Sequence, residues 1–186
     1  MYHIKKDKRS EKSTDLISKA YLELLKTNNY QEITVSDIQR ISGASRSTFY
    51  RNFDTPDDII RLMCDKGFDE IFKSKNGLLI SVNCFNYWFD NSNILEVLIK
   101  TGHMDYFSQT FANHLINSNI LQKYMSNDNE YRYFSFMLSY AMAGFLSGWI
   151  ANGRKETKSE LFKIIVHSIK TLKPAMLISS GSQSIK

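Results

Sequence analysis

Residues 46–53 carry the side chains best suited to recognition chemistry, in the order Arg-Ser-Thr-Phe-Tyr-Arg-Asn-Phe. At about 100° per residue, a helix here places Phe49 and Phe53 about 40° apart on one buried side. The other sides present Arg46, Ser47, Thr48, Tyr50 and Arg51. Arginine can bind guanine O6 and N7 with two hydrogen bonds, and hydroxyl groups bind phosphates. The pattern predicts a helix that reads the major groove of DNA; a solvated polar face is the alternative.

Capping residues mark where the neighbouring helices begin and end. Thr34 is a good N-cap with Asp37 at the third helical position, and Gly43 can adopt the left-handed conformation that ends a helix. Ser45 then caps the helix from Arg46 to Asn52. The short turn I-S-G-A-S joins the two, which is the form of a helix-turn-helix over residues 34–53. On their buried side we expect Ile38, Ile41 and Ala44 to pack beneath Phe49 and Phe53.

Two longer helices flank the helix-turn-helix. Apolar residues at helical spacing predict one helix over residues 9–28. Thr55 caps another that continues to about residue 75, with Pro56 at its first position. Asp57 and Asp58 follow, where negative charge stabilises the positive end of a helix dipole.

The segment from about Lys12 to Ile71 resembles the DNA-binding part of the TetR family of bacterial transcriptional regulators. The most specific stretch is T-V-S-D-I-Q-R-I-S-G-A-S-R-S-T-F-Y-R-N-F. The residues that match the family's pattern are Thr34, Asp37, Ile38, Gly43, Ser45, Thr48, Tyr50 and Phe53. The resemblance implies an N-terminal DNA-binding domain of three-helix type over residues 9–71.

The resemblance also implies roles for single residues. Thr34 and Thr48 would bind phosphates, and Tyr50 would lie against the DNA backbone or a thymine methyl. Base edges would be reached by Arg46, Ser47 and Arg51. The full set expected at the DNA is Thr34, Ser45, Arg46, Ser47, Thr48, Tyr50, Arg51 and Asn52.

One position departs from the family's pattern. Pro56 stands where a phosphate-contacting lysine is usual, and two aspartates follow it. The family's lysine contact with the DNA backbone therefore does not carry over to position 56. The basic residues near the N-terminus could replace it, and we expect residues 1–8 to form a mobile arm.

The whole sequence predicts an all-α protein of about nine helices, since two prolines and eight glycines are few helix breakers for 186 residues. Beyond the N-terminal unit, a larger C-terminal helical bundle is expected over residues 72–175, with a flexible tail over 176–186. We expect Gly77 and Pro174 to end helices. The helices of this bundle are expected at about 94–101, 105–125, 131–152 and 158–173.

The expected helix 131–152 has two faces that favour packing. One stripe is large and apolar, and a second consists of small residues, so the helix needs a partner besides its own domain. The stretch from Ser139 to Ile169 resembles the C-terminal helices of one TetR-type subgroup, in which W-x-x-N-G precedes an acidic capped helix. We expect a two-fold dimer interface, with a monomeric bundle as the alternative. Its expected residues are Ala143, Ser147, Ala151, Leu161, Ile165 and Ile169.

A set of aromatic and methionine side chains could line an apolar ligand pocket in the C-terminal region. Such residues at helical spacing more often form the hydrophobic core, and the TetR resemblance gives an effector cavity equal weight. The pocket residues expected on this basis are Phe85, Trp88, Phe89, Met104, Phe107, Phe111 and Met137.

Composition restricts the class of protein. A net charge of +5 permits a nucleic-acid partner. Two cysteines exclude a disulfide framework or a cysteine-rich zinc site, and the histidines form no metal-binding pair. No apolar run reaches the ~20 residues of a membrane span, and the charged N-terminus predicts no secretory signal. We therefore expect a cytoplasmic protein without metal or cofactor, and no motif favours an enzyme.

The sequence thus predicts a homodimeric, ligand-responsive DNA-binding regulator, a repressor that binds a palindromic operator. Its expected partners are double-stranded DNA, a second copy of the chain and a small apolar effector. The alternative is an all-α small-molecule or protein-interaction module whose specific DNA binding is weak or lost.

Overall fold

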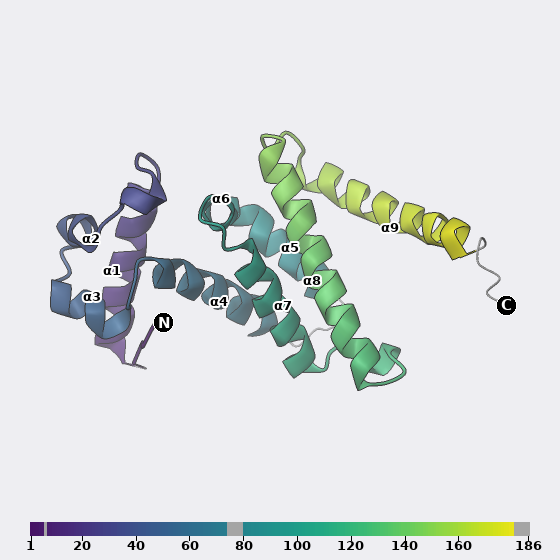
Figure 1. Ribbon diagram of the computed structural model, residues 1–186, viewed down its shortest axis with the longest axis horizontal. Helices are drawn as coiled ribbons and strands as arrows, with labels where there is room; N and C mark the ends of the chain where they lie inside the picture. The colour runs from purple at the N-terminus through teal and green to yellow at the C-terminus, as the bar shows by residue number, and fades with distance from the viewer. Residues whose placement is uncertain (6, 74–79, 181–186) are drawn as a thin grey trace. The chain divides into compact units, whose positions relative to one another are not determined.

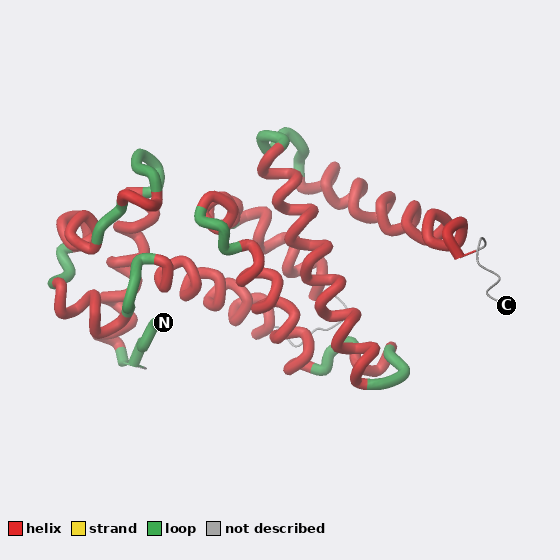
Figure 2. Tube along the Cα trace, in the orientation of Figure 1, coloured by secondary structure: helices red, strands yellow, loops and turns green. Residues whose placement is uncertain are grey.

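The computed structural model describes residues 1–5, 7–73 and 80–180. Within these ranges the chain forms nine α-helices and two short 3₁₀ helices (Figure 1). Figure 2 shows the described helices joined by loops, with no strand among them. The prediction of an all-α fold with about nine helices is confirmed.

The first four α-helices contain the predicted helix-turn-helix. They are α1 (Lys8–Leu24), α2 (Val35–Ser42), α3 (Arg46–Asn52) and α4 (Asp57–Lys73), with the 3₁₀ helix η1 (Tyr30–Glu32) after α1. α1 packs against α2, α3 and α4. The bounds of α3 agree with the sequence, whereas α1 ends four residues before the predicted Asn28.

A small apolar core holds these helices together. Ile17 and Tyr21 of α1, Ile38 of α2, and Phe49 and Phe53 are all fully buried. The expectation that Ile41 is also buried was wrong, because its side chain is 44% exposed. Ile41 lies about 60° around the helix from Ile38, which is enough to turn it from the core to solvent.

The remaining helices follow a long α4. They are α5 (Ile80–Asp90), α6 (Ser92–Lys100), α7 (Met104–Ser118), α8 (Asp128–Ala151) and α9 (Lys158–Ser180), with the 3₁₀ helix η3 (Gln122–Tyr124) between α7 and α8. α4 packs against α5, α6 and α7. The predicted break at Gly77 lies outside the described residues.

Two predicted helix ends were wrong. α7 stops at Ser118 rather than near residue 125, because Asn119 adopts a left-handed conformation with φ of 52°. α9 continues past Pro174 to Ser180. Proline lacks one backbone donor, which disfavours a helix interior but does not exclude it. Pro174 therefore need not end the helix, and α9 continues through it.

Aromatic rings form the centre of the core around α4. The ring centroid of Phe68 lies 5.2 Å from that of Trp88, 4.9 Å from that of Phe107 and 5.3 Å from that of Phe111. The neighbouring Gly67 is required by this packing, because a Cβ there would lie 2.7 Å from the Trp88 ring. α4 is thereby held closely against α5 and α7.

The chain divides into two compact units, residues 1–147 and 148–186. In the second unit, α8 ends at a turn where Gly153 has φ of +82°. A reciprocal cap then starts α9: the Thr157 N–H donates to Glu160 at 2.8 Å, and the Glu160 N–H donates to Thr157 Oγ1 at 3.3 Å. The acidic cap expected from the sequence is therefore present.

Of the described helices, α8 is long and apolar enough to cross a membrane when judged by length and composition only. A third of its most apolar window is buried inside the protein. Ser135 and Ser139 on this helix are buried and donate to backbone carbonyls four residues earlier. These bonds satisfy the buried hydroxyl groups within the helix itself.

Candidate nucleic-acid interface

A reciprocal hydrogen-bonded cap starts α2. Thr34 Oγ1 accepts from the Asp37 N–H at 3.2 Å, and the Asp37 carboxylate accepts from the Thr34 N–H at 3.1 Å. The Thr34 hydroxyl also donates to Asp37 at 2.6 Å, and these bonds lower the pKa of Asp37. The capping prediction is confirmed. A phosphate contact by the Thr34 hydroxyl would have to displace its bond to Asp37.

The turn between α2 and α3 has the geometry that the sequence predicts. Gly43 has φ of 69°, a left-handed conformation that glycine adopts without strain. Ser45 then caps α3 by accepting from the Thr48 N–H at 3.2 Å. The turn and cap determine where α3 begins and therefore which of its side chains face outward.

The outer surface of α3 carries cations whose partners are neutral. Arg46 donates to the Tyr50 hydroxyl at 3.4 Å, and its guanidinium carbon lies 5.5 Å from the centre of the Tyr50 ring. Arg51 donates to Thr48 Oγ1 at 3.3 Å. Ser47 is exposed beside them. The surface therefore combines two positive charges with hydroxyl groups, which is the chemistry that DNA bases and phosphates require.

Asn52 does not belong to this outer surface. It is 1% exposed, and its amide group donates to the Thr48 carbonyl at 2.7 Å. Its side-chain oxygen accepts from Ser10 of α1 at 2.7 Å. The expectation that Asn52 lies at the DNA was wrong: its side chain ties the end of α3 to α1.

A basic groove that the sequence analysis missed lies beside α3. Its volume is about 260 Å³, and the charged residues that line it are Arg9 and Lys12 of α1 and Arg51 of α3. The helix-turn-helix turn, including Ser45 and Thr48, forms its other wall. The spacing of Arg9 and Lys12, which places both on one face of α1, was the available signal. The groove has the size and charge for a phosphate group.

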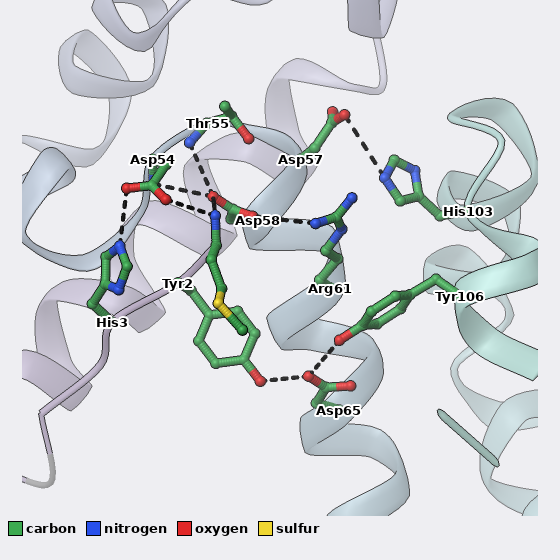
Figure 3. A network of polar contacts seen from close by, with 11 residues as sticks. Tyr2, His3, Asp54, Thr55, Asp57, Asp58, Arg61, Asp65, His103 and Tyr106 are labelled. Carbon is green, nitrogen blue, oxygen red and sulfur yellow. Dashed lines mark hydrogen bonds and ion pairs between the residues drawn. The ribbon is translucent and has the colours of Figure 1, made fainter. Parts of the chain in front are cut away.

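Residues 1–3, in the segment expected to form a mobile arm, contact the residues around the start of α4 (Figure 3). Tyr2 forms an isolated β-bridge with Phe53, and the His3 N–H donates to the Asn52 carbonyl at 2.8 Å. The Met1 amine lies 2.9 Å from a carboxylate oxygen of Asp58. These contacts join the N-terminal segment to the connection between α3 and α4.

The Asp58 carboxylate is buried and accepts hydrogen bonds within the connection between α3 and α4, rather than facing solvent. Its side chain is 1% exposed and accepts from the N–H groups of Asp54 and Thr55, both at 3.1 Å. Burial raises the pKa of Asp58, but the hydrogen bonds from the Met1 amine and these backbone groups outweigh it, and the pKa is lowered. α4 accordingly starts at Asp57, one residue after the predicted start at Pro56.

The residues of the predicted apolar pocket are packed to different degrees. Trp88, Phe107 and Phe111 are buried around Phe68 in the aromatic core, and Phe85 is also buried. Phe89 and Met104 are partly exposed, and Met137 is 58% exposed on α8. The structure thus brings Trp88, Phe107 and Phe111 together in the core and leaves Met137 at the surface.

The residues of the predicted dimer interface also differ in exposure. Ala143 and Leu161 are buried, Ser147 and Ile165 are partly exposed, and Ala151 and Ile169 are exposed. α9 carries further exposed apolar side chains at Ile164 and Val166. The second unit therefore leaves much of the apolar surface of α9 open to solvent.

The cysteines and the possible metal ligands within the described ranges are further candidates for a site. Cys64 and Cys84 are both buried and free, and burial raises the pKa of each thiol. Among the described residues, no three His, Cys, Asp or Glu side chains are grouped so that they could hold a metal ion.

Comparison with known families decides the classification. Residues 77–171, just over half of the 186-residue chain, match the family model TetR_C_8, which describes a transcriptional regulator C-terminal region. The chain belongs to the TetR family. This match covers the C-terminal helices, whereas the helix-turn-helix resemblance covers the N-terminal ones, so the two parts of the sequence point to one family.

Individual relatives agree with this assignment to the TetR family. The HTH-type dhaKLM operon transcriptional activator DhaS of Lactococcus lactis is 29% identical over 105 residues. That match covers 56% of this chain and 52% of DhaS, so the chain matches about half the length of this relative.

Solved structures show the same fold. A TetR-family structure from Syntrophomonas wolfei has a TM-score of 0.69 at 14% identity and covers 95% of this chain and 99% of its own. A TetR regulator from Streptococcus agalactiae has a TM-score of 0.59 at 21% identity and covers 88% and 97%. The TetR fold therefore extends over almost the whole chain.

Proposed function

We propose that this TetR-family protein is a homodimeric, ligand-responsive DNA-binding regulator. The observation that carries the proposal is the outer surface of α3, where Arg46 and Arg51 are held by neutral side chains and remain open to solvent. In the proposed complex α3 enters the major groove, and Arg46, Ser47 and Arg51 reach base edges. The DNA-binding domain is residues 9–71, and residues 72–175 form the effector and dimerisation domain.

Contacts to the DNA backbone come from residues around α3. Ser45, Thr48 and Tyr50 lie at the edges of its outer surface, and Arg9 and Lys12 line the adjacent basic groove. Phosphate contacts position a protein on the duplex without reading its sequence. In this chain the basic groove supplies the phosphate contact that a lysine makes in other members of the family, at the position where this chain has Pro56.

Dimerisation through α8 and α9 would present two copies of α3 to one operator. The side chains of Ile164, Val166 and Ile169 on α9 are apolar and exposed. They support dimerisation, because a second copy of the chain would bury them. Two-fold symmetry selects a palindromic operator with half-sites about one helical turn apart, roughly 34–36 Å. The helix-rich, basic chain would act in the cytoplasm.

A repressor that responds to an effector is the proposed mode of action. α4 packs against both α1 and the helices α5, α6 and α7, so a ligand that shifts α4 would also shift α3. A coupling free energy of about 1–3 kcal/mol between effector and operator would change DNA affinity roughly 5–150-fold. The relative DhaS is named an activator, and transcription in vitro from the flanking promoter, which a repressor lowers, distinguishes the two modes.

Fluorescence anisotropy with the intergenic DNA next to the protein's own gene tests the DNA-binding proposal. We expect a preference over a scrambled duplex that persists when the salt concentration is raised, because the phosphate contribution falls steeply with salt and base contacts do not. Arg46→Ala and Tyr50→Ala should abolish this preference, while sedimentation shows an unchanged dimer.

Arg132→Ala is the matched control, because it removes one exposed arginine from α8. It should bind the intergenic fragment like the wild type. Weak, salt-sensitive binding to both duplexes would instead support the alternative, an all-α module without specific DNA binding. Wild-type binding by Arg46→Ala would show that α3 is not the reading helix.

A further inference from the structure

A second groove lies between α4 and α7 in the unit of residues 1–147. Its volume is about 640 Å³, which is within the range of roughly 300–1,000 Å³ found for small-molecule sites. Two carboxylates, Asp65 and Asp69, line it together with the aromatic rings of Tyr2, Phe72 and Tyr106. None of the described lining residues is a lysine or an arginine. The groove is therefore acidic in a protein whose net charge is +5.

Asp65 is the best-held group in the groove (Figure 3). The hydroxyls of Tyr2 and Tyr106 converge on one carboxylate oxygen from two sides, and the Tyr106 distance is 2.8 Å. Thr110 donates to the other oxygen at 3.4 Å. All three donors are neutral, so the orientation of the carboxylate is set while its charge is not balanced.

The cations of α4 are committed to other acids. Arg61 lies 3.8 Å from Asp58, Lys66 lies 2.8 Å from Asp15, and Lys73 pairs with Glu70. Among the described residues, Asp65 has no ion-pair partner within 4 Å. A partly buried carboxylate in this state is stabilised by any cation that can reach it.

The rest of the groove suits the carbon skeleton of an organic cation. Asp69 lies one helical turn after Asp65, with Nε2 of His114 at 3.2 Å from one of its oxygens. The ring of Phe72 lies 5.2 Å from the His114 ring, and the Tyr106 ring already has the Arg61 guanidinium 5.5 Å from its centre. Aromatic faces attract cations and alkyl groups alike.

We propose that this groove binds an organic ammonium ligand, with the ammonium group on Asp65 and the carbon skeleton against Tyr2, Phe72 and Tyr106. The inference deepens the proposed function, on which its regulatory part rests, by naming the chemical class of the effector. It replaces the apolar effector expected from the sequence by a cationic one that binds Asp65 in this groove. Bound there, the ligand bridges α4 and α7 and so biases the position of the helix that follows α3.

Isothermal titration calorimetry on the full chain without DNA tests the binding step. The probes are phenylethylamine and spermidine, and 2-phenylethanol is the uncharged counterpart. We expect saturable binding of at least one amine and none of the alcohol. Asp65→Asn keeps the shape and removes the charge, and should weaken amine binding about tenfold or more.

Two further variants keep the test decisive. Asp69→Asn changes a side chain that is 68% exposed, so it should fold even if Asp65→Asn does not, and should weaken amine binding by a smaller factor. Glu23→Gln on α1 removes a charge outside the groove and should bind the amines like the wild type. Equal binding of alcohol and amine, no amine binding, or unchanged binding by both Asp variants would overturn the proposal.

The same titration with operator DNA separates this inference from the proposed function. If the protein binds an amine but not DNA, the proposed amine site is supported and the proposed function as a DNA-binding regulator is rejected. Specific DNA binding with no amine binding would reject the groove alone. Amine binding that changes operator affinity in the wild type, and changes it less in Asp69→Asn at the same amine concentration, would support both.

Discussion

The helix-turn-helix surface and the α4–α7 groove lie in one compact unit and carry opposite charges. Arg46 and Arg51 face outward and are held by a tyrosine and a threonine; Asp65 faces its groove and is held by two tyrosines and a threonine. In both places the partners of a charged group are neutral. Such groups are oriented but keep their charge available, and this distinguishes a binding surface from the ion pairs found elsewhere.

The ion pairs elsewhere on the chain show the contrast. Lys66 pairs with Asp15 across α4 and α1, and Lys100 pairs with Glu96 within α6. Lys26, in the turn after α1, pairs with Glu23 near the end of that helix. Exposed pairs of this kind contribute little to stability, about 0–1 kcal/mol. They neutralise charge locally, whereas Arg46, Arg51 and Asp65 have no oppositely charged side chain within 4 Å among the described residues.

The largest expected effect is on the free energy of unfolding, and it distinguishes the buried side of α3 from its outer surface. Phe49→Ala removes a fully buried ring and should lower the free energy of unfolding by about 3–5 kcal/mol. Tyr50→Ala, next to it, changes a side chain that is 44% exposed and should stay within about 0.5 kcal/mol of wild type. Denaturant unfolding of both variants measures the difference. Equal losses would contradict the division into buried and reading sides.

A double variant of α1 tests whether the basic groove contacts phosphates. Arg9→Ala with Lys12→Ala should weaken binding to intergenic and scrambled DNA alike, since phosphate contacts carry no sequence information. The slope of log affinity against log salt should become shallower by about 0.9 for each lost contact. Anisotropy at four salt concentrations measures that slope. Lys19→Ala with Lys155→Ala, which removes the same charge from exposed positions outside the groove, is the control.

The smallest effect concerns the acid at the α3–α4 connection. Because the pKa of Asp58 is lowered below 3.8 in the folded protein, its ionised form stabilises the fold above about pH 4. This contribution is lost as the pH falls through the folded pKa. Asp58→Asn should therefore be less stable than wild type at pH 7, and the difference should shrink below pH 3.8. Thermal melts from pH 3 to 7 measure it; a constant difference would exclude an ionic role.

Local hydrogen bonds explain which elements could be predicted. The caps at Thr34 and Ser45 and the left-handed Gly43 involve residues within four positions of one another, so their pattern is visible in the sequence. Helix ends without such a signal were less predictable. Asn119 ended α7 early, and Pro174 did not end α9.

Side-chain direction was harder to predict than helix position. Asparagine is a residue type common at DNA interfaces. The Asn52 side chain nevertheless points inward, where it accepts a hydrogen bond from Ser10, 42 positions earlier in the chain. Asp58 is likewise turned inward by the backbone of the connection before α4. In both cases a buried polar group must find a partner, and only the packing of α1, α3 and α4 decides where that partner is.

The all-α class, the helix-turn-helix and the outward chemistry of α3 were all determined by the sequence, because helical periodicity and capping depend on neighbours along the chain. The two charged grooves were decided by the tertiary structure. Tyr2 and Tyr106 reach Asp65 from 63 and 41 positions away, and Arg9 meets Arg51 only because α1 packs against α3. Groups so distant in sequence leave no periodic signal, and it is their meeting in space that leaves a charge without a counter-ion.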